Sequence, residues 1–155
     1  MTFRDHLADS KDLPKVVDFC ERLRKHHGGR GTMLIPSPLE VDGLMRRVRR
    51  GRLTTIKDLA DALARRHRTT IGCPITTGIF AWIAAHAADE WEREGRRRIT
   101  PWWRTLKTGG ALNPKYPGGL EEQARRLRAE GHLVEPARGR HPPHVLGFEK
   151  RRAPL

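Results

Sequence analysis

Apolar residues recur at helical spacing in several segments of the chain, and the first segment lies near the N-terminus. Its apolar positions, three or four residues apart, are Val16, Phe19, Cys20 and Leu23. Such spacing is typical of one face of an amphipathic helix. Asp12 would cap this helix, Pro14 suits its first turn, and Gly28 and Gly29 would end it. The pattern therefore predicts a helix from Asp12 to the two glycines.

Two capping boxes mark the starts of the next two helices. Ser37 stands three residues before Glu40 with Pro38 between them, and Thr55 stands three residues before Asp58. In a capping box the first side chain accepts a hydrogen bond from the backbone N–H three residues on, and the acidic side chain returns one. The positions expected to face the core are Val41, Leu44, Met45 and Val48 in the first helix and Ile56, Leu59, Ala60 and Leu63 in the second. Both segments are thus predicted to be helices that bury one face.

A longer helix is predicted from about Thr76 to Glu94, after a short turn through Gly72 and Pro74. Its large apolar residues, expected to face the core, are Ile79, Phe80, Ile83, Ala87 and Trp91. Two helices joined by a tight turn that contains glycine form the helix-turn-helix pattern. The pattern is common, so further features have to support it.

One side of this long helix is composed almost entirely of small residues. They are Thr77, Gly78, Ala81, Ala84, Ala85 and Ala88. Small side chains let a helix backbone approach another surface closely, which leaves two interpretations open. The helix either packs closely against a neighbouring helix or enters a narrow groove of DNA, where long side chains would hold it away.

The remaining elements complete a mainly α fold. A short helix with Leu120, Ala124 and Leu127 inward is followed by a β-hairpin between about His132 and Phe148. We expect a helix-turn-helix, winged-helix-like domain with an added N-terminal helix and a C-terminal β-hairpin. The predicted organisation is an N-terminal helical extension over 1–33, a DNA-binding domain over 34–131, and a hairpin with a basic tail over 132–155.

The charge of the chain indicates the class of partner. It has 31 Lys and Arg against 18 Asp and Glu, a formal net charge of +13, and such a field attracts the phosphate backbone of nucleic acid. No stretch has the roughly 20 apolar residues of a membrane-spanning helix. Because two histidines in His141 to His144 lack further ligands, we expect no metal and no cofactor. We expect a cytoplasmic, nucleoid-associated monomer that binds double-stranded DNA, with other repair proteins as further partners.

Four features in order carry a resemblance to a known family. They are the helix entry Gly51 to Thr55, the helix rich in small residues, the Pro-x-x-Arg segment Pro101 to Arg104, and Tyr116-Pro-Gly-Gly-Leu before a final helix. Over about Leu34 to His132 they resemble the C-terminal domain of O6-alkylguanine DNA alkyltransferases and the alkyltransferase-like proteins. The resemblance implies a DNA-binding domain whose second helix enters the minor groove, while a guanine rotates out of the stack into a pocket beside the Pro-x-x-Arg segment.

The chain departs from the enzymes of that family at the reacting residues. Trp102 stands where the enzymes have the cysteine that takes the alkyl group, and Trp103 stands where they have the activating histidine. An indole is neither a useful nucleophile nor a base at neutral pH, so alkyl transfer by this route is excluded. Ile56 and Gly78 replace a tyrosine and the arginine that fills the vacated stack. The chain therefore resembles the alkyltransferase-like proteins, which sense alkylated guanine without repairing it.

These considerations give two sets of candidate residues. The expected base pocket consists of Trp102, Trp103, Arg104, Tyr116, Gly118 and Gly119. The expected DNA contacts are Arg49, Arg50, Arg52, Thr54, Thr55, Thr76, Thr77, Gly78 and Ala81. If the two tryptophans lie in an extended segment, only one can point inward, which leaves the other free to stack on a base. Arg104 would either stabilise the local loop or contact DNA.

The sequence leaves two alternatives to a non-catalytic sensor of damaged bases. One is a repair enzyme on the same scaffold, for example one that cleaves a glycosidic bond, which needs a carboxylate or histidine in the pocket. The candidates for that role are His86, Asp89, Glu90, Glu121 and Glu122. The other alternative is a non-specific DNA-binding protein of the nucleoid.

Overall fold

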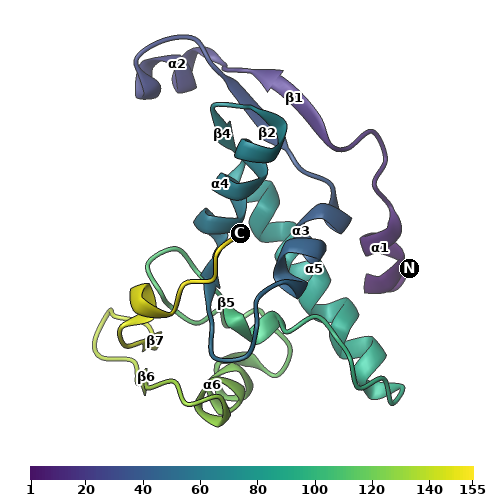
Figure 1. Cartoon of the computed structure of the whole chain (residues 1–155), viewed down its shortest axis with the longest axis vertical. Helices are drawn as coiled ribbons and strands as arrows, with labels where there is room; N and C mark the ends of the chain where they lie inside the picture. The colour runs from purple at the N-terminus through teal and green to yellow at the C-terminus, as the bar shows by residue number, and fades with distance from the viewer.

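The computed structural model describes residues 1–155 as a mainly helical protein with three small sheets. The helices are α1 (Phe3–Ala8), α2 (Glu21–His27), α3 (Pro38–Arg46), α4 (Ile56–His67), α5 (Pro74–Arg93) and α6 (Gly119–Ala129). The strands are β1 (Lys15–Asp18), β2 (Thr32–Ile35), β3 (Thr54–Thr55), β4 (Ile71–Gly72), β5 (Thr105–Leu106), β6 (Val134–Glu135) and β7 (His144–Val145). Short 3-10 helices cover Trp102–Arg104 (η1) and Phe148–Arg151 (η2). Figure 1 shows α2 at one end of the molecule and α6 at the other. None of the helices is both long and apolar enough to cross a membrane.

The long helix α5 is the centre of the larger hydrophobic core. Helices α1, α3 and α4 all pack on it, and its buried face is the side made of small residues. Thr77, Ala81, Ala84, Ala85 and Ala88 are fully buried. The close-packing interpretation of these residues is therefore correct, and entry of this face into DNA is excluded.

The prediction that the large residues of α5 face the core is confirmed for Ala87, which is fully buried, and wrong for Ile79. Ile79 is 49% exposed, and Phe80, Ile83 and Trp91 are half-buried at the edges of the core. The reason is that other side chains already occupy the core beside α5. Leucines of α3 and α4, such as Leu44 and Leu63, fill the space that the alanines of α5 leave open.

The capping box predicted at α3 is complete, whereas only half of the one predicted at α4 forms, because the Asp58 carboxylate pairs with Arg152. Ser37 and Glu40 form the complete box at α3, and the Thr55 hydroxyl accepts the N–H of Asp58 at α4 at 3.1 Å. The predicted core positions of α3 and the following turn, Val41, Leu44, Met45 and Val48, are all buried. In α4, Leu59, Ala60 and Leu63 are buried, whereas Ile56 is only half-buried.

The predicted helix from Asp12 is wrong, because this segment divides into β1 and the short helix α2. Strand β1 pairs antiparallel with β2, from Lys15 opposite Ile35 to Asp18 opposite Thr32. The side chain of Phe19 is buried beside Gly31, where a β-carbon would meet the Phe19 ring at 2.5 Å. The pairing with β2 supplies backbone hydrogen bonds that a helix would otherwise make internally. Only the predicted end is confirmed, since Gly28 closes α2 in the left-handed conformation.

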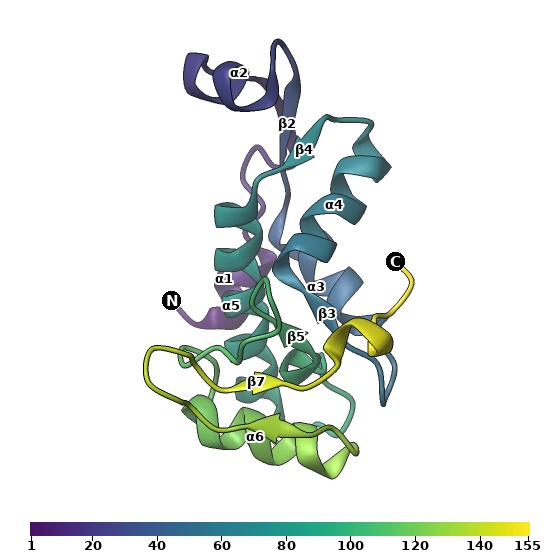
Figure 2. The ribbon, with the colours of Figure 1, turned by 90° about the vertical axis from the view of Figure 1, so that its left-hand side faces the viewer.

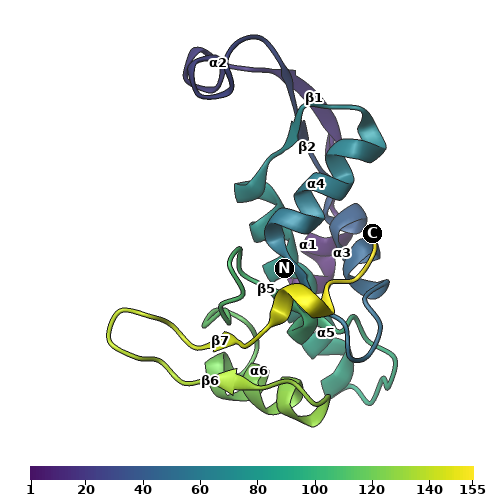
Figure 3. The same cartoon turned by 60° about the vertical axis from the view of Figure 1, so that its left-hand side comes forward.

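The C-terminal part of the chain forms a second, smaller core with α6. Its buried members are Leu53, Leu106, Leu112, Ala124, Leu127, Val145 and Phe148. The predicted hairpin is present as β6 and β7, and Figure 3 shows the loop between them extending away from the body. The final segment of the chain lies beside Leu53, a member of this core. The N–H of Leu53 donates to the carbonyl oxygen of Arg151, and the N–H of Ala153 donates to the carbonyl oxygen of Leu53.

Helices α4 and α5 lie side by side and are joined by the short strand β4 (Figure 2). Strand β4 pairs parallel with β2, Leu34 opposite Gly72. At Gly72 the backbone passes so close to α4 that a β-carbon would stand 2.3 Å from the carbonyl oxygen of Ala60. The connection between α4 and α5 is thus held by the pairing of β4 with β2 and by the close contact of Gly72 with α4.

Replacing Gly72 by alanine should lower the free energy of unfolding by about 1–3 kcal/mol, because a methyl group cannot fit against a backbone carbonyl without moving α4. Gly43 is the matched control, since it lies in α3 with open space around its Cα. Gly43→Ala should stabilise the protein by up to about 1 kcal/mol. Urea denaturation of both variants makes the comparison, and equal stabilities would contradict the close approach.

Candidate nucleic-acid interface

The residues expected to form a base pocket lie close together, but they pack against one another. Trp102 is fully buried. Its ring makes edge contacts with the rings of Trp103, with centroids 5.7 Å apart, and of Tyr116, at 5.6 Å. Burial raises the pKa of the Tyr116 hydroxyl, which therefore stays protonated. In this conformation the cluster around Trp102 is part of the core and leaves no room for a base.

Trp103 is held by an ionic network and is not free to stack on a base. Its Nε1 donates to a carboxylate oxygen of Glu130 at 3.0 Å, and Arg104 Nε donates to the same oxygen at 2.7 Å. The guanidinium of Arg126 lies over the Trp103 ring, 4.8 Å from its centroid. The assumption of an extended segment fails because Trp102 to Arg104 form the 3-10 helix η1.

Arg104 and the two glycines have structural roles. Arg104 also donates to the carbonyl oxygen of Val48 at 2.7 Å, so it ties η1 to the turn after α3. Gly118 and Gly119 have φ values of 76° and 71°, a conformation that favours glycine. They set the backbone at the start of α6. Glu130, which holds both Trp103 and Arg104, was not singled out from the sequence, since it lies 26 residues beyond Arg104 and no local pattern marks it.

A groove with exposed apolar side chains opens beside the start of α5. We call it the apolar groove. It has a volume of about 600 Å³, and its lining residues are Ile56, Pro74, Ile75, Gly78, Ile79, Trp82, Lys107, Asn113 and Lys115. Ile75 is 71% exposed and Ile79 is 49% exposed. Ile56 and Gly78, the residues expected from the resemblance to replace a tyrosine and an arginine, both line this groove.

The wall of the apolar groove opposite α5 is fixed by hydrogen bonds to one carbonyl group. The carbonyl oxygen of Lys115 accepts from Trp82 Nε1 at 3.1 Å and lies 2.8 Å from His86 Nε2. Phe3 of α1 stacks on the His86 ring, with centroids 4.6 Å apart, and meets the Trp82 ring edge-on at 5.1 Å. Helix α1 therefore supports both side chains that hold the loop carrying Lys115 against α5.

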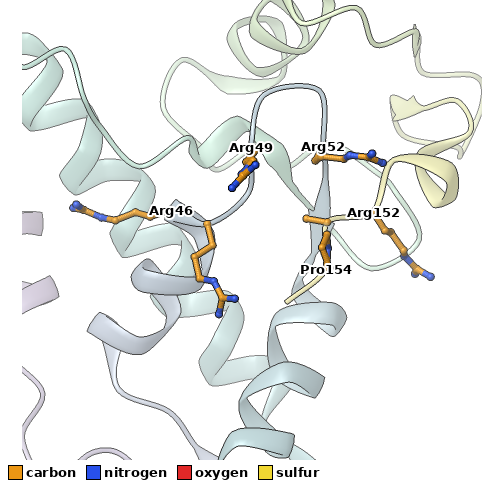
Figure 4. Close-up of a pocket in the computed structure, with 7 residues that line it drawn as sticks. Arg46, Arg49, Arg52, Arg152 and Pro154 are labelled. Carbon is orange, nitrogen blue, oxygen red and sulfur yellow. The ribbon is translucent and has the colours of Figure 1, made fainter.

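A second groove is lined mainly by arginines, and we call it the arginine groove. It has a volume of about 750 Å³, and its lining residues are Arg46, Arg47, Arg49, Arg52, Arg152, Ala153 and Pro154. Figure 4 shows Arg49 and Arg52 on the loop between α3 and β3, with Arg152 opposite on the C-terminal segment. Arg46 pairs with Asp42 at 2.8 Å and Arg152 with Asp58 at 3.2 Å.

Three arginines of this groove have no carboxylate partner. No ion pair is formed by Arg47, Arg49 or Arg52, and all three are at least partly exposed. Like charges gathered around a concave surface repel one another, and a bound polyanion would relieve that repulsion. Arg50 lies apart, because its side chain donates to the carbonyl oxygen of Ala129 at 3.0 Å.

The first turn of α4 separates the two grooves. Ile56 lines the apolar groove, whereas Asp58, two residues further on, pairs with Arg152 of the arginine groove. The segment from Arg52 to Ile56 runs directly between them through β3.

Several expected DNA contacts are buried behind this surface, which corrects the prediction for them. Thr54, Thr55, Thr77 and Ala81 have 1% or less of their surface exposed. Their side chains cannot touch a duplex in this conformation. Thr76 is half-buried, and its hydroxyl lies 3.2 Å from Cys73 Sγ at the cap of α5. The exposed residues at the start of α5 are instead Pro74, Ile75 and Ile79.

Most of the candidate acid and base residues are engaged elsewhere, and Glu121, which forms no ion pair, lines neither groove. Asp89 pairs with Arg93, and Glu90 accepts from Phe3 N and pairs with Arg4. Hydrogen bonds from Arg125 lower the pKa of Glu122 to about 2, far from the range useful for proton transfer near neutral pH. Neither groove is lined by a carboxylate. No group of three or more metal-ligating side chains is placed to hold an ion.

Searches of protein-family models, curated proteins and solved structures gave no significant match to this chain.

Removing the Glu130 carboxylate should strongly destabilise the protein. Its side chain is only 4% exposed and that of Arg104 13%, so Glu130→Ala leaves a nearly buried guanidinium unpaired, at a cost of about 3–5 kcal/mol. Glu121→Ala is the control, because Glu121 is exposed and forms no ion pair. Chemical denaturation gives the free energies of unfolding. A loss below about 1 kcal/mol for Glu130→Ala would show that the interactions of Glu130 with Trp103 and Arg104 do not stabilise the fold to this extent.

Proposed function

We propose that this protein binds duplex DNA without chemical turnover, through the apolar groove and the arginine groove. In this proposal α4 and α5 act as a helix-turn-helix pair, and the exposed face at the start of α5 meets the DNA. The observation that carries the proposal is the composition of the two grooves. Seven Arg or Lys residues line them and no carboxylate does, which is the electrostatic pattern expected of a surface for a phosphate backbone.

The exposed isoleucines support contact with the minor groove. Proteins that bind there often insert apolar side chains between base steps, which opens the stack and bends the duplex. Ile75 and Ile79 are four residues apart and so share one face of α5, and Gly78, which lines the same groove, has no side chain to keep the helix backbone away from the DNA. They would take the place of the single arginine finger that the resemblance implies.

A base that leaves the stack would meet the apolar groove rather than the cluster around Trp102. The groove offers Ile56 and Trp82 as apolar contacts and Asn113 as a polar one. Damaged or mispaired bases leave the stack at lower cost than intact ones. We therefore propose recognition of damaged or alkylated bases, in a repair context like that of the alkyltransferase-like proteins.

The absence of reactive groups in the grooves favours a sensor over an enzyme. Trp102 replaces the nucleophile, and the thiol of Cys73 is buried and bonded at the cap of α5. No side chain able to act as a general base near neutral pH lines either groove. Without such a group, glycosidic bond cleavage on this surface lacks its catalyst.

A second candidate is non-specific binding to chromosomal DNA in the nucleoid. The observation in its favour is that the grooves hold only two uncharged side chains able to form hydrogen bonds, Asn113 and Trp82, and the indole N–H of Trp82 already donates to the carbonyl oxygen of Lys115. Arginine and lysine contacts to phosphates carry no sequence information. On this alternative the protein binds intact and damaged DNA equally.

Binding to matched duplexes that carry guanine or O6-methylguanine separates these functions. The sensor binds the modified duplex more tightly and leaves it unchanged, as verified by recovering the DNA and analysing its bases. Equal affinities reduce the function to general DNA binding. Loss of the base or of the methyl group would establish an enzyme, and absence of binding to both duplexes would reject the whole proposal.

Replacing Arg49 and Arg52 together by alanine should weaken the salt dependence of DNA affinity. Each lost phosphate contact reduces the slope of log affinity against log salt by about 0.9, so the pair should reduce it by about 2. Arg93→Ala is the control, because Arg93 pairs with Asp89 outside both grooves. A slope unchanged by the double substitution removes the arginine groove from the interface.

A further inference from the structure

The segment from β1 to β2 forms an arm that projects from the body of the protein. We call residues 15–35 the basic arm. Its two strands pair with each other, and α2 joins their outer ends. No residue of α2 is buried. Figures 1 and 2 both show α2 at the end of the molecule, beyond the start of α5 and away from α6.

The basic arm is held in a fixed position relative to α5. Strand β2 pairs with β4, which leads directly into α5 through Cys73. Thr32 and Thr70 exchange hydrogen bonds, among them Thr32 N to Thr70 Oγ1 at 3.0 Å. Phe19 is buried where the arm turns into α2. The arm is therefore a rigid extension of the connection between α4 and α5.

The outer end of the arm is strongly basic. Its cationic side chains are Arg22, Arg24, Lys25 and Arg30, and the histidines His26 and His27 lie beside them. The only acidic residue of α2 is Glu21, which pairs with Lys25 at 3.4 Å. The end of α4 adds Arg65, Arg66 and Arg68, none of which forms an ion pair. Thr70 follows this group and bonds to Thr32 in β2, and Figure 2 shows α2 and the C-terminal end of α4 at the same end of the molecule.

We propose that the basic arm binds the phosphate backbone of DNA beyond the segment that contacts α5. This inference rests on the proposed function, since it extends the same interface. Four residues per strand at about 3.3 Å each carry the arm about 13 Å from its base. At about 3.4 Å per base pair this reach corresponds to about four base pairs of flanking duplex.

The composition of α2 favours DNA over a protein as the occupant. The only apolar residue of α2 is Leu23, whereas the centre of a stable protein interface requires several apolar or aromatic side chains. A seven-residue helix that buries none of its residues also gains little from packing. Helix α2 therefore serves to expose cationic side chains, which suit contacts with the regularly spaced phosphates of DNA.

The test compares a hairpin duplex of about 6 base pairs, which extends about 10 Å from its centre, with a duplex of about 24 base pairs, because only the longer one can contact α5 and the arm together. The variant is Arg22→Ala/Lys25→Ala/Arg30→Ala. The matched control is Arg96→Ala/Arg97→Ala/Arg98→Ala, which removes the same charge from exposed positions after the end of α5. Circular dichroism verifies that both variants fold.

On the long duplex, the arm variant should reduce the slope of log affinity against log salt by about 2–3, since each lost contact contributes about 0.9. On the short duplex its slope should equal that of the wild type, and the control should leave both slopes unchanged. Equal losses for the arm variant and the control, or no loss on the long duplex, would overturn the role of the arm. If the wild-type protein binds neither duplex, the proposed function itself fails and the arm proposal with it.

Discussion

The close packing of small side chains on α5 is the constraint on which the rest of the structure depends. Alanines such as Ala81, Ala84 and Ala88 let α1, α3 and α4 approach the axis of α5 closely, and leucines from α3 and α4 fill the core. The larger residues of α5 are consequently turned outward. Ile75, Ile79 and Trp82 reach the surface because the opposite face is occupied, so the apolar groove is a direct result of how the core is built.

The parts of the fold that could be predicted from the sequence are those set by local chemistry. The cap at Ser37 and the apolar spacing in α4 and α5 depend on residues a few positions apart, and the structure confirms them. The N-terminal segment could not be predicted in this way. Its apolar residues recur at helical spacing, and the strand forms because of pairing with β2 across a long separation in the chain, 18 residues between Val16 and Leu34.

The candidate site was predicted less well, because burial is decided by contacts distant in the sequence. In helix α5, Ala87 is buried as predicted, whereas Ile79, expected in the core, is exposed, and Thr77 and Ala81, expected to contact DNA, are buried. Trp102 and Trp103 were treated as an extended pair, whereas the 3-10 helix places one in the core and the other against Glu130. The indole of Trp102 fills the space at the position where the enzymes carry their nucleophile. Our proposal therefore moves base recognition from that cluster to the neighbouring apolar groove.

Indole N–H resonances during titration of the 15N-labelled protein with duplex DNA test this central claim most directly. Trp82 lies in the apolar groove, whereas Trp102 is fully buried in the core. The account predicts a large shift for the Trp82 indole and for the backbone amides of Ile75, Gly78 and Ile79, with little change at the Trp102 indole. A dominant shift at the Trp102 indole, with Trp82 unmoved, would show that DNA engages the cluster around Trp102 and would contradict the account.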